Sequence, residues 1–335
     1  MPNPDIFIQI QKNIAPELKM VDNTILSSAH GKAELIAEIT NHLVSSGGKR
    51  IRPILTILSA KLCGYKDGER HCNLAAAVEL IHTATLLHDD VVDGSSLRRG
   101  KKTANSIWDN KASILVGDYL LSVAFQLMVK DGSLEVLDLL SKTSGIMADG
   151  EVLQLTNSND IEISIDKYLE IISCKTAILF AAATKVGAII SGLDAIKQKA
   201  LADFGTNLGI SFQIIDDVLD YDSDEKTFGK KIGNDFCEGK ITLPIILTYR
   251  KATSLEKSTI KEIFANNLIS NQSEKDEKSF AQIMELMKKY NTINESKNMA
   301  RDYHNLALDN LKHFSNTPEK SMLIDILKYG LFRQN

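Results

Sequence analysis

Apolar residues recur every three or four positions along most of this chain, which is the spacing of helices with a buried face. Alternating β-branched runs, which would predict strands, are scarce. Stretches 165–192 and 201–219 are apolar on most faces, as helices inside a large bundle are. The pattern predicts helices roughly over 5–28, 32–46, 52–64, 72–93, 103–129, 133–155, 166–190, 195–222, 239–252, 256–266, 278–290, 292–314 and 319–332. We expect an all-α fold, a single large bundle over residues 1–335, with a polar surface loop at 270–279.

The stretch from Ile81 to Gly100 places acidic residues at the end of an apolar helix, reading I-H-T-A-T-L-L-H-D-D-V-V-D-G-S-S-L-R-R-G. Asp89 and Asp93 are four residues apart, so they lie on one helix face, with Asp90 between them in sequence. Like charges at this spacing repel, and a bound cation would reverse the sign of that interaction. A solvated acidic helix end explains the stretch equally well if it stands alone.

A second acidic triplet, Asp216, Asp217 and Asp220, follows the apolar run I-S-F-Q-I-I. Burying charged carboxylates is costly unless a counter-ion is present. Two triplets are therefore explained more economically by one cavity with shared metal ions than by two solvated faces. Oxygen ligands without nearby cysteine suit Mg²⁺, which takes one or two protein carboxylates and completes its shell with water and substrate phosphate.

Several basic residues are suited to a phosphate-bearing anion. They are Arg98 and Arg99 after the first triplet, Lys49 and Arg52 in G-G-K-R-I-R-P, Lys175 in S-C-K-T-A, and Lys230, Lys231 and Lys240 in the glycine-rich loop after the second triplet. Each has an ordinary alternative, namely a basic turn, a charged loop, or a helical lysine that reaches solvent. His82, two turns before Asp89, is either a core histidine or a phosphate donor.

Composition narrows the classes of function. The chain has 335 residues, 44% of them hydrophobic, enough for a large core in one or two domains. A net charge of -4 argues against nucleic-acid binding. Four cysteines without C-x-x-C spacing fit a reducing, cytoplasmic location. No secretory signal or long uninterrupted apolar run is evident, so we expect no stable membrane insertion.

Together these stretches resemble the trans-prenyltransferases, the family of all-trans polyprenyl diphosphate synthases. The similarity covers about residues 15–330 and runs through G-G-K-R-I-R-P, H-T-A-T-L-L-H-D-D-V-V-D with R-R-G, G-E-V-L-Q-L, C-K-T-A, F-Q-I-I-D-D-V-L-D and E-G-K-I-T-L-P. It is greatest to the long-chain branch that makes octaprenyl diphosphate. One departure is Gly94, where an acidic residue is frequent in the family.

The resemblance implies an isoprenoid-synthase-type helical bundle with a central cavity, working as a homodimer. It implies an Mg²⁺-dependent enzyme, with about three ions when substrate is bound, that condenses isopentenyl diphosphate with an allylic diphosphate. It assigns the metal to Asp89, Asp90, Asp93, Asp216, Asp217 and Asp220; the allylic diphosphate to Arg98, Lys175, Lys230 and Lys240; isopentenyl diphosphate to Lys49, Arg52, His82 and Arg99; and the reacting centre to Thr176 and Gln213. Lys231 remains an alternative to Lys230, because loop spacing varies in the family.

Two small residues, Ala84 and Thr85, lie one helical turn before Asp89. In the family, bulky aromatic residues at this place give short products, and small residues leave room for a growing chain. The resemblance therefore implies a long product, octaprenyl (C40), built on farnesyl diphosphate for a quinone side chain. Loss of diphosphate from the allylic substrate would leave a carbocation, which water would convert to an alcohol. The cavity is therefore also expected to exclude water.

Three other functions compete with this interpretation. A terpene cyclase usually carries N-D-x-x-S-x-x-x-E, and Asn159 and Ser164 miss that spacing by one residue. An HD-type phosphohydrolase, suggested by His88 beside Asp89, would need further histidine ligands near the acidic motifs and a transition metal. An inactive subunit of a heteromeric synthase would be expected to lose motif aspartates, and all six are present.

Overall fold

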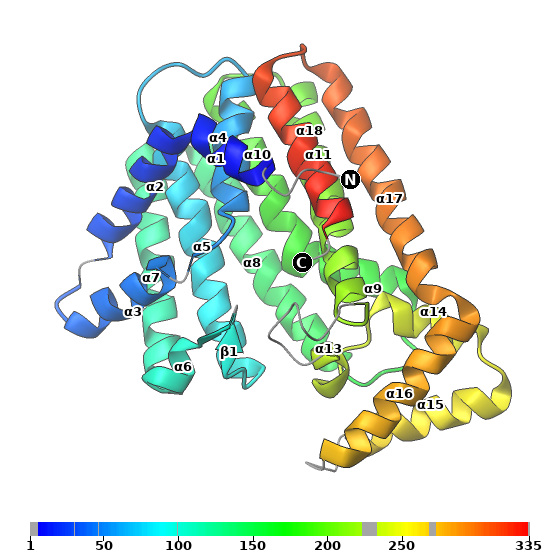
Figure 1. The fold of residues 1–335 in the computed structure, drawn as a ribbon. Helices are drawn as coiled ribbons and strands as arrows, with labels where there is room; N and C mark the ends of the chain where they lie inside the picture. The colour runs from blue at the N-terminus through cyan, green and yellow to red at the C-terminus, as the bar shows by residue number, and fades with distance from the viewer. Residues whose placement is uncertain are drawn as a thin grey trace. The chain divides into compact units, whose positions relative to one another are not determined.

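A computed structural model of the chain describes residues 6–29, 31–45, 47–98, 100–222, 233–267 and 273–333. Within these ranges the chain is almost entirely helical, which confirms the predicted all-α class. The strands found there are β1 (Leu97–Arg98) and β2 (Lys101–Lys102), an antiparallel pair with Arg98 opposite Lys101. Figure 1 shows the helices from the N-terminus in blue to the C-terminus in red.

The chain divides into two compact units, which are described separately. The first comprises Met1–Gly145, Ile178–Thr206 and Ala307–Tyr329, and the second comprises Ile146–Ala177, Asn207–Leu306 and Gly330–Asn335. Helices of the first unit are α1 (Ile6–Asn13), α2 (Ala15–Ser28), α3 (Glu34–Ser45), α4 (Ile51–Leu62), α5 (Arg70–Val92), α6 (Ala104–Ile107), α7 (Asn110–Asp131), α10 (Ile178–Ile190) and the short η2 (Leu311–His313). Helices of the second are α9 (Ile165–Ile172), the π-helical η1 (Ser173–Ala177), α13 (Asn234–Cys237), α14 (Leu243–Lys251), α15 (Ser254–Asn267) and α16 (Ser273–Tyr290). Residues of α8 (Leu134–Thr156), α11 (Ala195–Leu219), α17 (Thr292–Asn310) and α18 (Pro318–Phe332) belong to both.

Helix α5 forms the centre of the first unit. It packs against α2, α4, α7 and α10, and Figure 1 shows α5 and α7 as neighbouring cyan helices. Residues 74–81 are all buried, as expected for a helix that is apolar all round. The one acidic residue among them, Glu79, accepts a hydrogen bond from Arg50 at 2.8 Å, so the buried carboxylate is paired.

The second unit is built on an apolar cluster that includes three isoleucines of α11 and the aromatic residues of α13 and α16. The Phe236 ring lies 5.3 Å from Phe264 and 5.6 Å from Phe280, measured between ring centres. Helix α14 packs against α9, α15 and α16, and Figure 1 shows α15 and α16 side by side in yellow and orange. This cluster fixes α9 and α11, the helices that carry much of the candidate site.

Several predicted helix boundaries are wrong, each for a local reason. The predicted helix 103–129 is broken at Asp109, whose φ of 137° is not helical and whose side chain caps α7 by accepting from the Ala112 N–H at 2.8 Å. The predicted helix 5–28 is divided at Ile14. The predicted loop 270–279 is helical from Ser273, because its glutamates and lysines are good helix formers despite their polarity.

Two helical stretches have the length and composition to cross a membrane, α7 and Ile165–Ile190. In their most apolar windows 50% and 72% of the residues are buried inside the protein. Core helices of globular proteins meet the same criterion. The four cysteines, all within the described residues, form no disulfide.

Gly187 sets how closely α10 approaches α4. A Cβ at this position would lie 2.4 Å from the backbone nitrogen of Ala60, so α4 or α10 would have to shift. We expect Gly187→Ala to lower the free energy of unfolding by about 1–3 kcal/mol. Gly145→Ala on α8, where a Cβ would meet nothing within 4 Å, is the matched control and should raise it by about 0.5–1 kcal/mol. Urea denaturation checks both, and equal midpoints would contradict the close contact.

Candidate active site

The first aspartate motif lies at the C-terminal end of α5. Asp90 is buried, and its Oδ1 accepts from both Nε and an Nη of Arg98, at 2.9 and 2.8 Å. Asp89 and Asp93 are half-buried, and Asp93 caps the helix. The middle carboxylate is thus held by the protein, and the predicted diphosphate ligand Arg98 is already bound to it.

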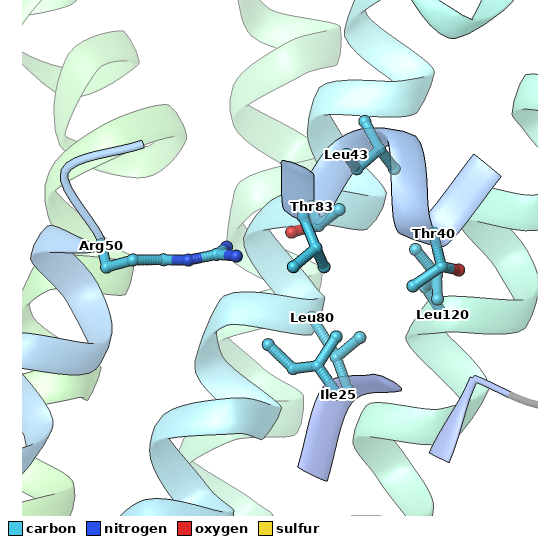
Figure 2. Close-up of a pocket in the computed structure, with 8 residues that line it drawn as sticks. Ile25, Thr40, Leu43, Arg50, Leu80, Thr83 and Leu120 are labelled. Carbon is cyan, nitrogen blue, oxygen red and sulfur yellow. The ribbon is translucent and has the colours of Figure 1, made fainter. Parts of the chain in front are cut away.

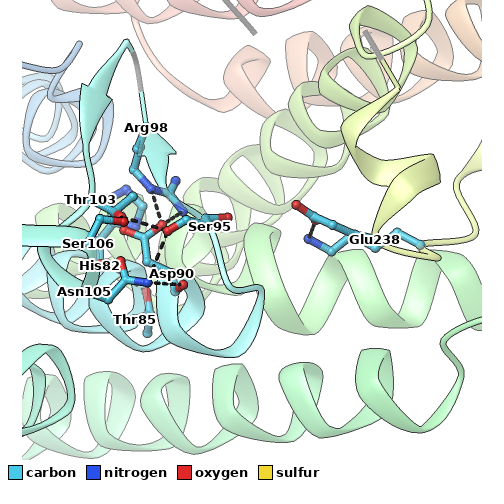
Figure 3. Close-up of polar contacts among 10 residues, drawn as sticks. His82, Thr85, Asp90, Ser95, Arg98, Thr103, Asn105, Ser106 and Glu238 are labelled. Atoms are coloured by element: carbon cyan, nitrogen blue, oxygen red, sulfur yellow. Dashed lines mark hydrogen bonds and ion pairs between the residues drawn. The ribbon is translucent and has the colours of Figure 1, made fainter. Parts of the chain in front are cut away.

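The segment after Asp93 folds back to deliver Arg98. Asn105 donates to the backbone carbonyls of Asp90 and Ser95, at 3.1 and 3.2 Å, and Thr103 donates to the Ser95 carbonyl at 2.8 Å. Figure 3 shows these bonds gathered around Asp90. Because α5 leaves its last carbonyls without helical partners, these donors also stabilise the helix end.

The three cations of the G-G-K-R-I-R segment have two kinds of partner, carboxylates and aromatic rings. Arg50, at φ 49° before α4, pairs with Glu79 at 2.8 Å and Asp22 at 3.2 Å, and it points toward an apolar pocket among α2, α3, α5 and α7 (Figure 2). Lys49 Nζ lies 4.7 Å from the centre of the Tyr329 ring, and the Arg52 guanidinium lies 4.7 Å from the centre of the Phe180 ring. Arg50 therefore stabilises the fold, and rings orient the two predicted substrate ligands.

A π-helical turn, η1, carries Lys175 and Thr176 between α9 and α10. Such turns are rare in proteins overall, but many of those known occur at functional sites. The extra residue in the turn changes the direction in which the following side chains point. The turn packs closely on α8: a Cβ on Gly150 would lie 2.7 Å from the Lys175 backbone nitrogen. Lys175 donates to Glu151 at 2.8 Å, so the lysine predicted to bind diphosphate is paired with a carboxylate.

The second motif lies near the end of α11. Asp217 is buried, and each of its oxygens has a donor: Tyr168 at 2.6 Å and Gln213 at 2.8 Å. Gln213 in turn accepts from Thr176 at 2.9 Å, which brings together two residues predicted at the reacting centre. Burial, and then the negative charge of Asp235, raises the pKa of Asp217 to about 8, while the Tyr168 and Gln213 hydrogen bonds oppose the rise.

The outer aspartates of this motif are more accessible. The Asp216 side chain is 45% exposed and accepts from Arg333 at 2.6 Å. Arg333 is only 6% exposed, lies 3.6 Å from the centre of the Phe212 ring, and donates to the Phe212 carbonyl at 2.9 Å. Asp220 is half-buried, and one of its oxygens accepts from the Asp235 N–H at 3.0 Å.

Some of the remaining predicted residues are described by the structure, and others lie outside the described ranges. Lys240 donates to Glu238 at 2.6 Å (Figure 3), and His82 is half-buried on α5, its carbonyl accepting from Thr85 at 2.8 Å. Ala84 is buried. Arg99, Lys230 and Lys231 lie outside the described residues.

No three His, Cys, Asp or Glu side chains in the described ranges form a ready-made metal cage. This does not conflict with an Mg²⁺ site, because Mg²⁺ takes few protein carboxylates and fills its shell with water and substrate phosphate. The exposed carboxylate of Asp216 and the half-buried Asp89 and Asp93 are oxygen donors of the required kind.

Four residues that were not predicted from the sequence contact the predicted site residues: Tyr168, Arg333, Glu151 and Glu238. Tyr168 lies two helical turns before Lys175, a spacing that puts both near one helix face and would have drawn attention to it. Arg333 gave no signal, because its partner Asp216 is far away in sequence.

Comparisons with known proteins agree with these motifs. A family model described as polyprenyl synthetase matches residues 33–288. The octaprenyl diphosphate synthase of Haemophilus influenzae is 37% identical over 95% of this chain and 94% of its own length. That of Escherichia coli is 44% identical over 76% of this chain and 78% of its own. Similar proteins also include a nonaprenyl diphosphate synthase of Rhodobacter capsulatus and a geranylgeranyl diphosphate synthase of Sulfolobus acidocaldarius.

Solved structures share the fold. A polyprenyl synthase from Caulobacter crescentus, complexed with calcium and isoprenyl diphosphate, superimposes with a TM-score of 0.91 at 39% identity, covering 98% of both chains. The helical fold is therefore of the isoprenoid synthase type, as predicted. The family match, the aspartate motifs and the fold together show that this chain is a prenyltransferase of the polyprenyl synthetase family.

Proposed function

We propose that this chain is a long-chain, all-trans polyprenyl diphosphate synthase that adds isopentenyl diphosphate units to an allylic diphosphate primer. The observation that carries the proposal is the division of roles within each aspartate motif. In each, the middle aspartate is buried and held by protein donors, and the outer aspartates are more accessible. Buried, satisfied carboxylates organise a site, and accessible ones are available to a cation.

Polyprenyl synthetases are in general Mg²⁺-dependent, and the donor set of this chain fits that ion. Asp89 and Asp93 at the C-terminal end of α5, and Asp216 and Asp220 at that of α11, would bind Mg²⁺, about three ions with substrate bound. Asp90 and Asp217 would instead orient their neighbours. Bound Mg²⁺ would supply positive charge where negative charge develops on a leaving diphosphate.

The remaining charged residues account for substrate binding. Arg98, Lys175 and Lys240, with Lys230 in the loop outside the described residues, would contact the allylic diphosphate. Lys49, Arg52 and His82, with Arg99, would hold isopentenyl diphosphate. When the allylic C–O bond breaks, its electron pair leaves with the diphosphate, and these fixed cations stabilise that charge. The double bond of isopentenyl diphosphate then forms the new C–C bond, and the proton it loses passes to a diphosphate oxygen.

Thr176 and Gln213 would face the reacting allylic group. The Thr176 hydroxyl donates to the Gln213 carbonyl oxygen, so the threonine oxygen keeps its lone pairs directed outward for a nearby cation. Apolar side chains of the bundle would enclose a central cavity and exclude water, which would otherwise convert the carbocation to an alcohol.

The finer features of the proposal concern the product and the assembly. The small residues at 84 and 85 support a long product. From the family resemblance we propose octaprenyl (C40), built on farnesyl diphosphate for a quinone side chain. Similar proteins are named for products of other lengths, so family membership alone does not set the product length. The proposal of a long product rests on Ala84 and Thr85. We also propose a cytoplasmic homodimer without stable membrane insertion.

A single assay tests the function. Purified protein is incubated with Mg²⁺, farnesyl diphosphate and labelled isopentenyl diphosphate, and products are separated by chain length after removal of the diphosphate. We expect C40 to dominate and chelation of Mg²⁺ to abolish incorporation. Absence of incorporation would overturn the proposal, and a product of another length would overturn only the octaprenyl assignment.

Arg333 competes with any cation for Asp216, so its removal should favour metal binding. An ion pair with one exposed partner is worth up to about 1 kcal/mol, which is about fivefold in affinity. We expect Arg333→Met to lower the half-saturating Mg²⁺ concentration by about that factor, measured by calorimetry with inorganic diphosphate present. Lys297→Met, which removes a cation paired with Asp222 outside the motif, is the control. If the half-saturating Mg²⁺ concentration of Arg333→Met is equal to or higher than that of Lys297→Met, Arg333 does not compete with the cation.

Bulky residues at positions 84 and 85 should shorten the product. We expect Ala84→Phe and Thr85→Phe to shift it to about C15–C20, because the added rings fill space that the chain would occupy. Thr85 is half-buried, so its substitution tests the idea if Ala84→Phe disturbs the fold. Thr83→Phe is the matched control, because Thr83 lines the separate pocket of Figure 2 and should leave the length unchanged. Product chromatography decides, and unchanged lengths in both variants would refute the assignment.

A further inference from the structure

A continuous set of hydrogen bonds surrounds Asp217 in the second unit. Tyr168 donates to Oδ2 at 2.6 Å, Gln213 donates to Oδ1 at 2.8 Å, and Thr176 donates to the Gln213 oxygen at 2.9 Å. Tyr168 is 3% exposed and Asp217 is 4% exposed. Because both carboxylate oxygens have a donor, the plane of the carboxylate is fixed rather than merely its position.

The Tyr168 hydroxyl is the part of this arrangement that packing does not explain. The ring lies in the apolar cluster of the second unit, where phenylalanine would fill nearly the same volume. A buried tyrosine hydroxyl requires a polar partner, and here that partner is a carboxyl oxygen of Asp217. At 2.6 Å the hydrogen bond lies at the short end of the range for a hydroxyl donor and an oxygen acceptor.

The bonds also join two pieces of the site. Tyr168 is on α9, and Thr176 is on the π-helical turn that continues it. One contacts Asp217 directly and the other through Gln213, so the α9–η1 segment is attached to α11 at two points. Lys175 lies between these attachments in sequence, and its distance from the second motif is therefore set by both.

We propose that Tyr168 is a positioning residue for the second aspartate motif. By holding Asp217 inward it directs the adjacent Asp216 outward toward a metal–diphosphate ligand, and it fixes the register of η1, with Lys175, against α11. This inference rests on the proposed function and adds to it a residue that touches neither substrate nor metal.

The test compares two buried tyrosines that differ in partner. Tyr221 is also 3% exposed and belongs to the same apolar cluster, but its hydroxyl bonds to Thr242 at 3.0 Å. Tyr168→Phe and Tyr221→Phe each remove one buried hydroxyl, so thermal unfolding of the metal-free proteins controls for stability. We expect both variants to remain folded, with similar Tm values.

The decisive readouts separate positioning from stability. Loss of an outer-shell partner typically lowers metal affinity or activity by about 10–100-fold. For Tyr168→Phe we expect a loss of at least about tenfold in the affinity for Mg²⁺ with inorganic diphosphate, by calorimetry, and in kcat, with KM for isopentenyl diphosphate within about twofold. Tyr221→Phe should change none of these by more than about twofold.

A double variant then checks that Tyr168 acts through Asp217. If it does, adding Tyr168→Phe to Asp217→Asn should cause little further loss of metal–diphosphate affinity, since contacting residues are not additive. Equal behaviour of Tyr168→Phe and Tyr221→Phe, or additive losses in the double variant, would overturn the role of Tyr168. Wild-type protein that transfers no prenyl group would instead overturn the proposed function.

Discussion

The structure depends on placing carboxylates inside helical bundles without leaving them uncompensated. A lone buried carboxylate is so unfavourable that it either gains a proton or finds donors. Asp90 and Asp217 both find donors, a guanidinium in one case and a phenol with an amide in the other. These partners come from separate segments: the hairpin after α5, the helix α9 and the neighbouring turn of α11. The hydrogen-bonding demands of two buried carboxyl groups therefore fix the loops and helices around them.

Departures from regular backbone occur at the residues that need redirecting. The π-turn lets Thr176 reach Gln213 and Lys175 reach Glu151, and Gly150 allows α8 to lie against that turn. Arg50 adopts a left-handed conformation before α4 and so reaches Glu79. Left-handed geometry is unfavourable for a residue with a Cβ, and the ion pairs of the Arg50 guanidinium with the buried Glu79 and with Asp22 offset it.

Helical periodicity made most of the fold predictable, because a buried face is a local property of sequence. The same periodicity indicates that the middle aspartate of each motif lies on the buried face of its helix. Asp90 continues the buried series Ile81, Ala84 and Leu87 at intervals of three, and Asp217 follows Ile210 and Ile214 on the buried face of α11. The motifs predict six metal ligands, and the helical periodicity further distinguishes one inner aspartate from two outer ones in each motif.

Other features could not be predicted, since they depend on contacts between distant segments or on backbone geometry without a sequence signature. The pairing of Arg333 with Asp216 is of the first kind. The two-residue strands that deliver Arg98 are too short to show a pattern, and S-C-K-T-A has no feature that marks it as π-helical. The break at Asp109 interrupts an apolar pattern that continues on both sides.

Among the described residues, the three cations proposed to bind the allylic diphosphate are each paired with a carboxylate, which bears on how substrate would bind. Arg98 is on Asp90, Lys175 on Glu151 and Lys240 on Glu238. The two lysine pairs are partly exposed, and such pairs are worth only about 0–1 kcal/mol, so under the proposed function a diphosphate with several charges would displace the glutamates at little cost. The Arg98 pair differs, because Asp90 is 3% exposed and would be left as an uncompensated charge. If Arg98 binds phosphate as proposed, it can keep Asp90 through Nε and one Nη, because the five N–H donors of a guanidinium leave others for the phosphate.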